Sequence, residues 1–433
     1  MMTYEEALGF IHGATRVGAR DGFARMERML EILGNPHHKL KFIHVAGTNG
    51  KGSTATMTAN ILTRAGYRTG LFISPYVVDF RERIQLNGRL IPKEELAAAV
   101  EALQPAFAQV KAEIAECTEF ETVTLIALWW YARQGCDYVV LEAGIGGRSD
   151  KTNVIPAPAV AVLTSISCDH THILGNTLAA IADNKSGIIK PGCRAAVYCD
   201  LPAEALEVVQ KRCAEVGVTP NIPNMDRLEI LHLGAEGSDI RYKGQAYHVP
   251  LIGRHQIFNT LTVLAVCEEL RAQGAVLPYE TVRDAIADTR FVGRCEVLRT
   301  DPLCIIDGAH NIDGARALGR VIDEVMADRR VTLVMGMLAD KDYRESITLL
   351  AGRADRFIAV TPDSYRSLPA AEAAEVAKTV CGDVAVVEKP AEGALYALRT
   401  AAPDEVIIAC GSLYMIGEVK QALLAEEFPR DDK

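Results

Sequence analysis

A glycine-rich turn between an apolar run and a helix-like segment carries the strongest chemical signal in this 433-residue sequence. The run Lys41 to Ala46 leads into GTNGKGS, where two glycines flank Lys51. Glycines let backbone N–H groups approach phosphate oxygens, and a helix N-terminus favours negative charge. Lys51 can then reach terminal phosphates, while Ser53 or the next hydroxyl residue meets magnesium. The strict pattern GxxxxGK[ST] is not met, because Val45 stands at its first glycine, and a tight turn without a ligand is the alternative.

A carboxylate and a histidine follow two other apolar runs. Glu142 comes at the end of the run Tyr138 to Ala143 and leads into a glycine-rich loop, and Asp169 and His170 follow a further run. Strand ends at the carboxyl edge of a parallel sheet gather ligands, and magnesium prefers oxygen donors. If the two strands are neighbours, His170 lies beside Glu142. Spacing alone leaves alternatives open, because Glu142 could cap a turn and His172 competes with His170.

These side chains need strands and helices that bring them together. Apolar runs alternate with helix-period segments along most of the chain, which predicts parallel strands joined by crossover helices and an α/β fold. We predict strands over the ranges 41–46, 69–74, 138–143, 160–166 and 195–199. We predict helices over about 122–134 and 255–273, and a hairpin over 234–250.

The C-terminal third repeats the alternation of strands and helices. A second set of strands begins near Leu303, with the runs CIIDGAH, VTLVMGM, RFIAV, VAVVEK and EVIIACGS. The polar segment Cys295 to Pro302 precedes this set and ends in a proline, which cannot continue a helix. A chain of this length exceeds what one hydrophobic core normally serves. We therefore predict two domains, 1–298 and 299–433.

Composition excludes several classes of protein. The formal net charge of -10 and the pI of about 5.6 argue against nucleic-acid binding and against binding to an anionic membrane. The first ten residues lack the pattern of a secretory signal, and no stretch reaches the length of a membrane span, so we expect a cytoplasmic enzyme of small molecules. The eleven cysteines form no CxxC pair, so neither a disulfide framework nor a structural zinc site is indicated.

A set of motifs occurs in a fixed order along the chain, namely GTNGKGS, ISPYVVDFRERI, TEFETVT, LEAGIGGRSDKTN, DHTHILG, KSGIIKPG, HQIFN, GRCE and DGAHN. Together they resemble the folylpolyglutamate synthase family, with dihydrofolate synthases as close relatives and the cell-wall Mur ligases as more distant ones. The resemblance covers nearly the whole chain. It implies a P-loop ATPase domain with a mostly parallel sheet, followed by a smaller Rossmann-like α/β domain, and a monomer.

The resemblance also implies which residues hold ATP and magnesium. The ATP phosphates would bind to the turn residues Thr48, Asn49, Gly50, Lys51, Gly52 and Ser53. Further nucleotide contacts would come from Asn259, Arg294 and Asp307. Two magnesium ions would be held by Ser74, Glu142, His170 and Lys185. Lys185, which with Lys190 could otherwise lie on a solvated helix face, would be carbamylated, because a carbamate supplies the oxygen donor that an ammonium cannot.

The reaction implied by the resemblance is the ligation of L-glutamate to a folate. The γ-phosphoryl group of ATP is transferred to the folate γ-carboxylate, and the amine of glutamate then displaces phosphate from the acyl phosphate. The catalytic side chains would be Lys51, His170, Lys185, Asp307 and His310, with His310 and Ser412 toward glutamate. The pterin would contact Phe80, Arg83 and Phe120. For these side chains a core aromatic, a surface charge pair, a helix N-terminus and a cap are the ordinary alternatives.

Three other functions compete with this one. A dihydrofolate synthase, alone or on the same protein, would add glutamate to dihydropteroate by identical chemistry. A Mur ligase would carry a nucleotide-sugar domain before the phosphate turn, and the roughly forty residues found there are too few for a domain. A P-loop protein that uses ATP as a switch would need neither DHTHILG and KSGIIKPG nor the second domain.

Overall fold

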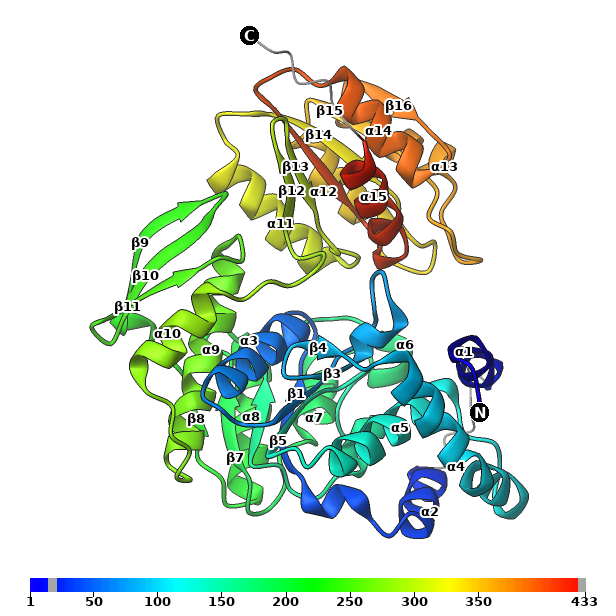
Figure 1. Cartoon of the computed structure of the whole chain (residues 1–433). Helices are drawn as coiled ribbons and strands as arrows, with labels where there is room; N and C mark the ends of the chain where they lie inside the picture. Colours follow the sequence, from blue (N-terminus) through cyan, green and yellow to red (C-terminus); the bar gives the residue numbers. More distant parts are fainter. Residues whose placement is uncertain (15–21, 427–433) are drawn as a thin grey trace. The chain divides into compact units, whose positions relative to one another are not determined.

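The structure is a computed structural model that describes residues 1–14 and 22–426. The chain forms two compact units, which consist of Met1–Asp226 with Phe258–Ile286 and of Arg227–Ile257 with Ala287–Lys433. Both units combine helices with mostly parallel strands, so the predicted α/β class is confirmed (Figure 1). The division passes through helix α9 (Arg254–Arg271). The single boundary near residue 298 stays a prediction, because the two units interleave along the chain.

The first unit is built on a sheet whose strands run in the order β4-β3-β2-β5-β1-β6-β7-β8. Neighbours from β2 to β8 are parallel, and β3 and β4 add an antiparallel edge. The central strands are buried along their length, which explains their uninterrupted apolar sequences, since helices cover both faces of such sheets. The strands are β1 (Lys41–Ala46), β2 (Thr69–Phe72), β3 (Ile84–Leu86), β4 (Arg89–Leu90), β5 (Tyr138–Glu142), β6 (Val160–Leu163), β7 (Arg194–Val197) and β8 (Pro220–Asn221).

Two hydrophobic clusters pack helices against this sheet. One joins Phe42, Val139 and Leu141 to α1, α2, α4 and α5, and the other joins Ala161 and Leu163 to α7 and α8. The helices of this unit, besides the part of α9 that belongs to it, are α1 (Tyr4–Gly13), α2 (Ala24–Ile32), α3 (Lys51–Arg64), α4 (Lys93–Glu113), α5 (Glu119–Arg133), α6 (Thr171–Leu174), α7 (Leu178–Ser186), α8 (Ala203–Glu215) and α10 (Tyr279–Ala287).

Helix α5 begins three residues earlier than the predicted 122. Thr118 is its N-cap and accepts a hydrogen bond from the Glu121 backbone N–H, while the Glu121 side chain accepts one from the Thr118 N–H. This reciprocal capping box satisfies two donors that would otherwise be unpaired at the helix start. The TEFE segment therefore belongs to the helix start, and Phe120 lies in its first turn.

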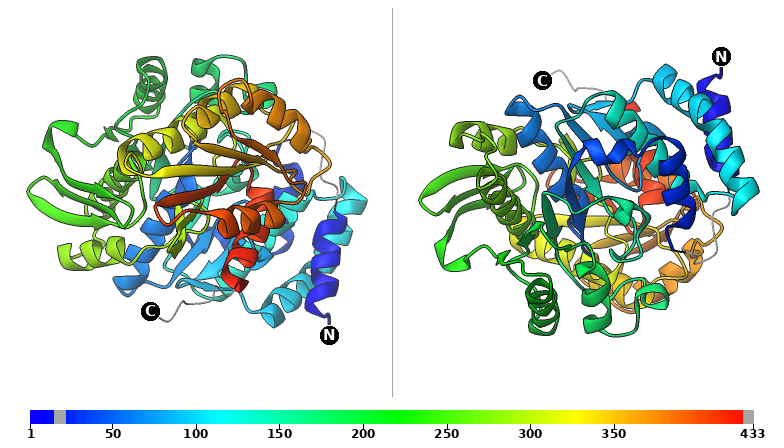
Figure 2. Two further views of the ribbon diagram at one scale, coloured as in Figure 1. Left: turned by 90° about the horizontal axis from the view of Figure 1, so that it is seen from above. Right: turned by 90° about the horizontal axis from the view of Figure 1, so that it is seen from below.

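The second unit contains a sheet in the order β12-β13-β17-β14-β15-β16, in which only the β12 edge pairs antiparallel. Helices α11, α12 and α13 pack on one face, while α14 and α15 pack together on the other (Figure 2). The elements are β12 (Glu296–Thr300), β13 (Leu303–Ile306), α11 (Ile312–Val325), β14 (Arg330–Met335), α12 (Tyr343–Ala351), β15 (Arg356–Ala359), α13 (Ala370–Ala377), β16 (Val384–Val386), α14 (Pro390–Thr400), β17 (Glu405–Cys410) and α15 (Leu413–Ala425).

A small antiparallel sheet completes the second unit. Its strands β9 (Leu228–Gly234), β10 (Gly237–Tyr242) and β11 (Gln245–Val249) lie in the order β11-β10-β9. The predicted hairpin over 234–250 is confirmed as β10 and β11, and β9 joins it as a third strand.

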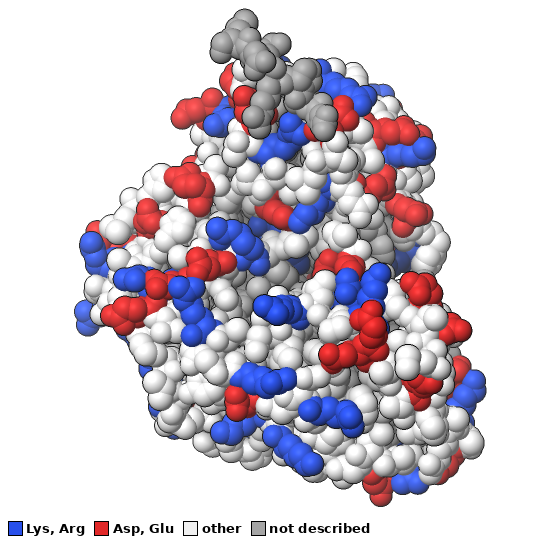
Figure 3. Space-filling model, in the orientation of Figure 1, with Lys and Arg blue, Asp and Glu red and all other residues white. Residues whose placement is uncertain are grey.

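Three general features bear on the expectations from composition. Acidic and basic side chains are interspersed on the face drawn in Figure 3. All eleven cysteines are free thiols. Within the residues that the structure describes, no helix combines the length and the apolar character needed to cross a bilayer.

Candidate active site

The glycine-rich turn joins β1 to α3, as its sequence predicts. Gly50 is the N-cap of α3 and has a left-handed backbone with φ of 84°, which glycine adopts without strain. A Cβ added at Gly50 would lie 2.4 Å from Asn259 Oδ1, and one added at Gly47 would lie 1.8 Å from Thr164 Oγ1. Both glycines are therefore required by close neighbours. The Asn259 side chain lies against the turn, as the predicted nucleotide contact requires.

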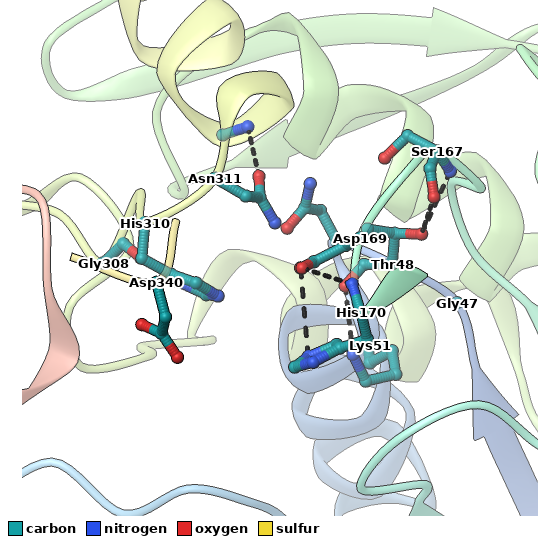
Figure 4. A network of polar contacts seen from close by, with 12 residues as sticks. Gly47, Thr48, Lys51, Ser167, Asp169, His170, Gly308, His310, Asn311 and Asp340 are labelled. Carbon is teal, nitrogen blue, oxygen red and sulfur yellow. Dashed lines mark hydrogen bonds and ion pairs between the residues drawn. The ribbon is translucent and has the colours of Figure 1, made fainter. Parts of the chain in front are cut away.

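The turn is braced against the loop after β6. Thr48 N–H donates to Ser165 O at 2.6 Å, and the Thr48 hydroxyl donates to Ser167 O and accepts from Ser167 N–H. Lys51 Nζ donates to Thr48 O at 3.0 Å, so the lysine folds back over its own turn (Figure 4). Asn49 N–H donates to the Ser165 hydroxyl. The loop is thus preorganised before any ligand is considered.

Two hydroxyl groups at the start of α3 lack a hydrogen-bond partner among the residues that the structure describes. Ser53 Oγ and Thr54 Oγ1 are buried and make no hydrogen bond within the described part of the chain. Buried polar groups are normally satisfied, and exceptions call for an explanation. Hydroxyls at a helix N-terminus behind a glycine turn suit a phosphate group and its metal ion. These two hydroxyl groups without partners are therefore the evidence that the turn fits a nucleotide phosphate.

Glu142 is buried at the carboxyl end of β5, and its Oε2 accepts a hydrogen bond from Ser74 N–H at 2.9 Å. The predicted magnesium ligands Ser74 and Glu142 therefore meet, because β2 and β5 are adjacent. The condition under which the sequence would place His170 beside Glu142 is not met, since β1 lies between β5 and β6. The strand that carries the phosphate turn thus separates the two.

His170 is partly exposed and has a left-handed backbone at the start of α6. Its N–H donates to Asp169 Oδ1 at 2.7 Å, and its Nε2 lies 4.0 Å from Asp169 Oδ2 (Figure 4). Among the described residues, no three His, Cys, Asp or Glu side chains gather in the manner of a metal site. Magnesium commonly uses only one or two protein carboxylates and completes its shell with phosphates and water. One carboxylate, Glu142, together with Ser74 and His170 matches this preference of magnesium.

Lys185 lies on α7 and is only 3% exposed. Its Nζ donates to Gly47 O at 2.7 Å, so it reaches the base of the phosphate turn. Burial, followed by the charge of Lys51, lowers the pKa of Lys185 to about 7, although Asp169 and Asp150 oppose this shift. The alternative of a solvated face is wrong for Lys185. Lys190 is partly buried as well and donates to the carbonyl oxygens of Asn153 and Ile155.

A buried polar chain beside Glu142 was missed from the sequence. His44 Nε2 lies 2.8 Å from Thr152 Oγ1, which donates to Asp150 Oδ1 at 2.5 Å, and Asp150 Oδ2 accepts from Ile145 N–H. Burial raises the pKa of Asp150 and lowers that of His44 to about 3. This chain fastens the loop that follows Glu142. The sequence did contain one signal for this chain of polar contacts, namely a histidine, His44, within the apolar run KFIHVA.

The predicted pterin contacts are not equivalent. Phe80 is buried, with its ring centroid 5.3 Å from that of His12 and 5.6 Å from that of Tyr76, which favours packing over ligand contact. The guanidinium of Arg83 lies over the rings of Tyr76 and Phe80. Phe120 lies over the loop after β5, where a Cβ at Gly144 would come within 2.7 Å of its ring. Arg83 and Phe120 remain the better candidates.

The other predicted residues lie in the second unit, at the carboxyl end of its strands. Asp307 follows β13, and its carboxylate accepts hydrogen bonds from Cys295 N–H and Ala309 N–H at 2.8 Å each. The guanidinium of Arg294 lies over Phe291 and donates to Gly293 O. These contacts hold both charged groups in fixed positions.

His310 and Ser412 also belong to the second unit. His310 Nδ1 lies 2.7 Å from Gly308 O (Figure 4). Ser412 is buried and caps α15 by accepting a hydrogen bond from Tyr414 N–H at 3.2 Å, so the capping role considered from the sequence is present.

These features define a class of protein. Both units are α/β, and the first presents a phosphate-type turn with a buried carboxylate and a buried lysine at one sheet edge. Residues 45–267 match the Mur ligase middle domain, and residues 293–413 match the Mur ligase glutamate ligase domain.

Relatives place the chain more narrowly. It is 33% identical to a dihydrofolate synthase/folylpolyglutamate synthase of Bacillus subtilis over 97% of this chain and 99% of the relative. It is also 33% identical to a folylpolyglutamate synthase of Lacticaseibacillus casei over 98% and 99%. A Mycobacterium tuberculosis folylpolyglutamate synthase structure complexed with ADP matches with a TM-score of 0.88, 27% identity and 98% coverage of both chains. The chain therefore belongs to the folylpolyglutamate and dihydrofolate synthase family of the Mur ligases.

Proposed function

We propose that this protein ligates L-glutamate to the γ-carboxylate of a folate, with ATP converted to ADP and phosphate through an acyl phosphate. Family membership supports this proposal, together with the names of the relatives and the ADP complex of the Mycobacterium tuberculosis protein. The observation that carries it is the junction of Lys185 with the phosphate turn, where the lysine Nζ lies 2.7 Å from Gly47 O. A protein that used ATP binding only as a conformational switch would need no buried amine beside this turn.

Phosphoryl transfer to a carboxylate brings two anions together, so positive charge must lie at the turn. Lys51 supplies it on one side, and the backbone N–H groups at the start of α3 supply partial positive charge on the other. The hydroxyls of Ser53 and Thr54 would donate hydrogen bonds to phosphate oxygens or coordinate the bound ion through their oxygen atoms. Asn259 would bound the turn on the side of Gly50.

Magnesium fits the residues at this edge. Ser74, Glu142 and His170 would hold one ion, which when bound neutralises phosphate charge and aligns the reacting groups. A carbamate on Lys185 would supply oxygen donors for a second ion. The lowered pKa of Lys185 supports this, because a neutral amine can add to carbon dioxide whereas an ammonium cannot. In this proposal the protein's own contribution is to keep that amine buried and neutral.

The second unit would serve the nucleotide and the incoming amino acid. Asp307 and Arg294 are held rigidly by backbone contacts, as nucleotide-positioning groups should be. His310 would face glutamate. Ser412 would act on glutamate only through α15, since its hydroxyl is buried and accepts from Tyr414 N–H. We further propose that the protein acts as a monomer in the cytoplasm.

Dihydrofolate synthase activity is the second candidate, because the Bacillus subtilis relative carries both names. An assay of ADP release separates the possibilities. Purified protein with ATP should release ADP only when both a folate and glutamate are present, and equal release without glutamate would contradict the ligase proposal. Replacing the folate by dihydropteroate tests the second activity in the same assay.

A further inference from the structure

A second polar cluster lies entirely within the second unit, at the carboxyl edge of its sheet. It consists of Asp340, Tyr365, Arg366 and Tyr414. Asp340 follows β14, Tyr365 and Arg366 follow β15, and Tyr414 lies in the first turn of α15, after β17. Strands β17, β14 and β15 are consecutive neighbours, so three adjacent strand ends supply the cluster. Open parallel sheets bind their ligands at this edge.

The cluster is centred on the Arg366 guanidinium. One terminal nitrogen donates to Asp340 Oδ2 at 2.8 Å, and the other donates to the Tyr414 hydroxyl at 3.3 Å. The Cζ atom lies 5.7 Å from the ring centroid of Tyr365 and 6.0 Å from that of Tyr414. Each terminal nitrogen carries a second N–H, and about a third of the side chain is exposed. The guanidinium is oriented and still has donors for a ligand.

The backbone around Arg366 is held firmly. Arg366 O accepts from Ala339 N–H at 2.8 Å, Leu368 N–H donates to Met337 O at 2.9 Å, and Leu338 forms a β-bridge with Ser367. The loop after β15 is therefore fastened to the loop after β14. Preorganisation of this kind lowers the entropic cost of binding a ligand.

Two aromatic rings are exposed on this fixed frame. Tyr365 is 89% exposed and Tyr414 is 56% exposed. Tyrosines that present a flat apolar ring and a polar tip to solvent are enriched where proteins bind partners or ligands. Their rings flank Arg366 and supply apolar walls beside a charged pair.

We propose that this cluster recognises the head group of the incoming amino acid, with Arg366 binding its α-carboxylate and Asp340 accepting hydrogen bonds from its ammonium. The proposal rests on the proposed ligase function. The cluster presents both signs of charge 2.8 Å apart, which matches a zwitterion. A γ-linked glutamyl tail fits less well, because it is polyanionic and its internal nitrogens are amides. The tyrosine rings would border the methylene groups of the same ligand.

Steady-state kinetics of two substitutions tests the assignment. Arg366→Gln and Asp340→Asn should each raise the KM for L-glutamate, by roughly 10–100-fold for Arg366→Gln, since a hydrogen bond to a charged group contributes that much. The KM values for ATP and folate should stay within about twofold in both variants, and so should kcat in Arg366→Gln. Asp340→Asn should also lower kcat, because Asp340 contacts the nitrogen that attacks the acyl phosphate. Glutarate, which lacks the ammonium, should lose inhibition in Arg366→Gln and keep it in Asp340→Asn.

Arg353→Gln is the matched control. Arg353 pairs with Asp323 at 3.0 Å and is about equally exposed, but it precedes β15 and so belongs to the opposite end of the sheet. If the KM for glutamate in Arg366→Gln equals that of this control, or if only the KM for folate rises, the assignment is overturned. Arg366→Lys provides a folded variant that keeps the charge but not the planar fork. Wild-type protein that releases no ADP with folate and glutamate would instead contradict the proposed function itself.

Discussion

The two sheet edges differ in how they treat charge. At the edge of the first unit, Glu142 and Lys185 are almost fully buried, and burial lowers the pKa of Lys185 to about 7. At the edge of the second unit, the ion pair of Arg366 and Asp340 is partly exposed, and the more exposed Tyr365 and Tyr414 flank it. Burial favours the neutral form of the Lys185 amine, whereas partial exposure leaves the charged groups of the second edge accessible to a ligand. The first edge is suited to bond-making, and the second to recognition.

The largest effect is expected at a buried ion pair that supports the first edge. Glu121 Oε2 accepts a hydrogen bond from Arg25 Nε and Glu121 Oε1 accepts one from a terminal nitrogen of Arg25, at 3.0 Å each. Glu121 Oε1 also lies 2.9 Å from Lys151 Nζ. Glu121→Ala removes two charge-assisted hydrogen bonds from the buried Arg25 guanidinium, which should lower the free energy of unfolding by about 3–5 kcal/mol. Chemical denaturation measures this. Glu113→Ala, which breaks the exposed pair with Arg28, should cost much less, and equal losses would contradict the contrast between buried and exposed charge.

The next largest effect is expected at the phosphate turn. Lys51→Ala removes the charge that we propose faces the transferred phosphoryl group, so kcat should fall by about 10²–10³-fold. The melting temperature should change little, because Lys51 is partly exposed and its amine bonds only to Thr48 O among the described residues. An unchanged kcat would contradict the proposal that this turn takes part in phosphoryl transfer.

Lys185→Ala tests the buried amine. Activity should fall by about 10²-fold, and added acetate or formate should restore part of it by supplying the missing carboxylate oxygens. Lys190→Ala is the control on the same segment and should show no rescue by these anions. Wild-type rates in Lys185→Ala would end the carbamate proposal.

The pH dependence of the wild-type protein should report the same amine. Because the pKa of Lys185 is lowered to about 7, the amine becomes neutral as pH rises through 7, and carbamate formation becomes favourable. Activity should therefore fall by several-fold from pH 8 to pH 6, and bicarbonate should lessen the fall. Between the folded pKa and the ordinary value of 10.5, the unfolded chain binds more protons, so this group makes stability rise with pH. A profile flat from pH 6 to 8 would contradict a lysine that titrates near 7.

The smallest effect is expected for an exposed side chain of the second edge. Tyr365→Ala should change the free energy of unfolding by no more than about 0.5 kcal/mol, because the ring is mostly in solvent. Thermal denaturation measures this. Phe80→Ala, a buried aromatic, is the comparison and should cost several times more. A large loss in Tyr365→Ala would show that the exposed edge is structural.

Much of the fold could be predicted from periodicity. The run Lys41–Ala46 is strand β1 to the residue, and the helix over 255–273 appears as α9 with ends within two residues. Local patterns suffice here because a buried parallel strand requires a continuous apolar run. The predicted first residue of α5 was wrong, because a capping box at Thr118 sets the start of this helix rather than apolar spacing.

The sequence by itself determined the glycine-rich turn between β1 and α3, since an apolar run, closely spaced glycines and a helix-like segment follow one another there. It could not determine which strand ends meet, and only the tertiary structure placed β1 between β5 and β6. Nor could it distinguish Lys185 as a buried amine from Lys185 on a solvated face. Burial depends on elements far apart in the chain, and a pKa depends on burial. For that reason the chemistry of Lys185, and the alignment of Arg366 with Asp340, became visible only in the folded protein.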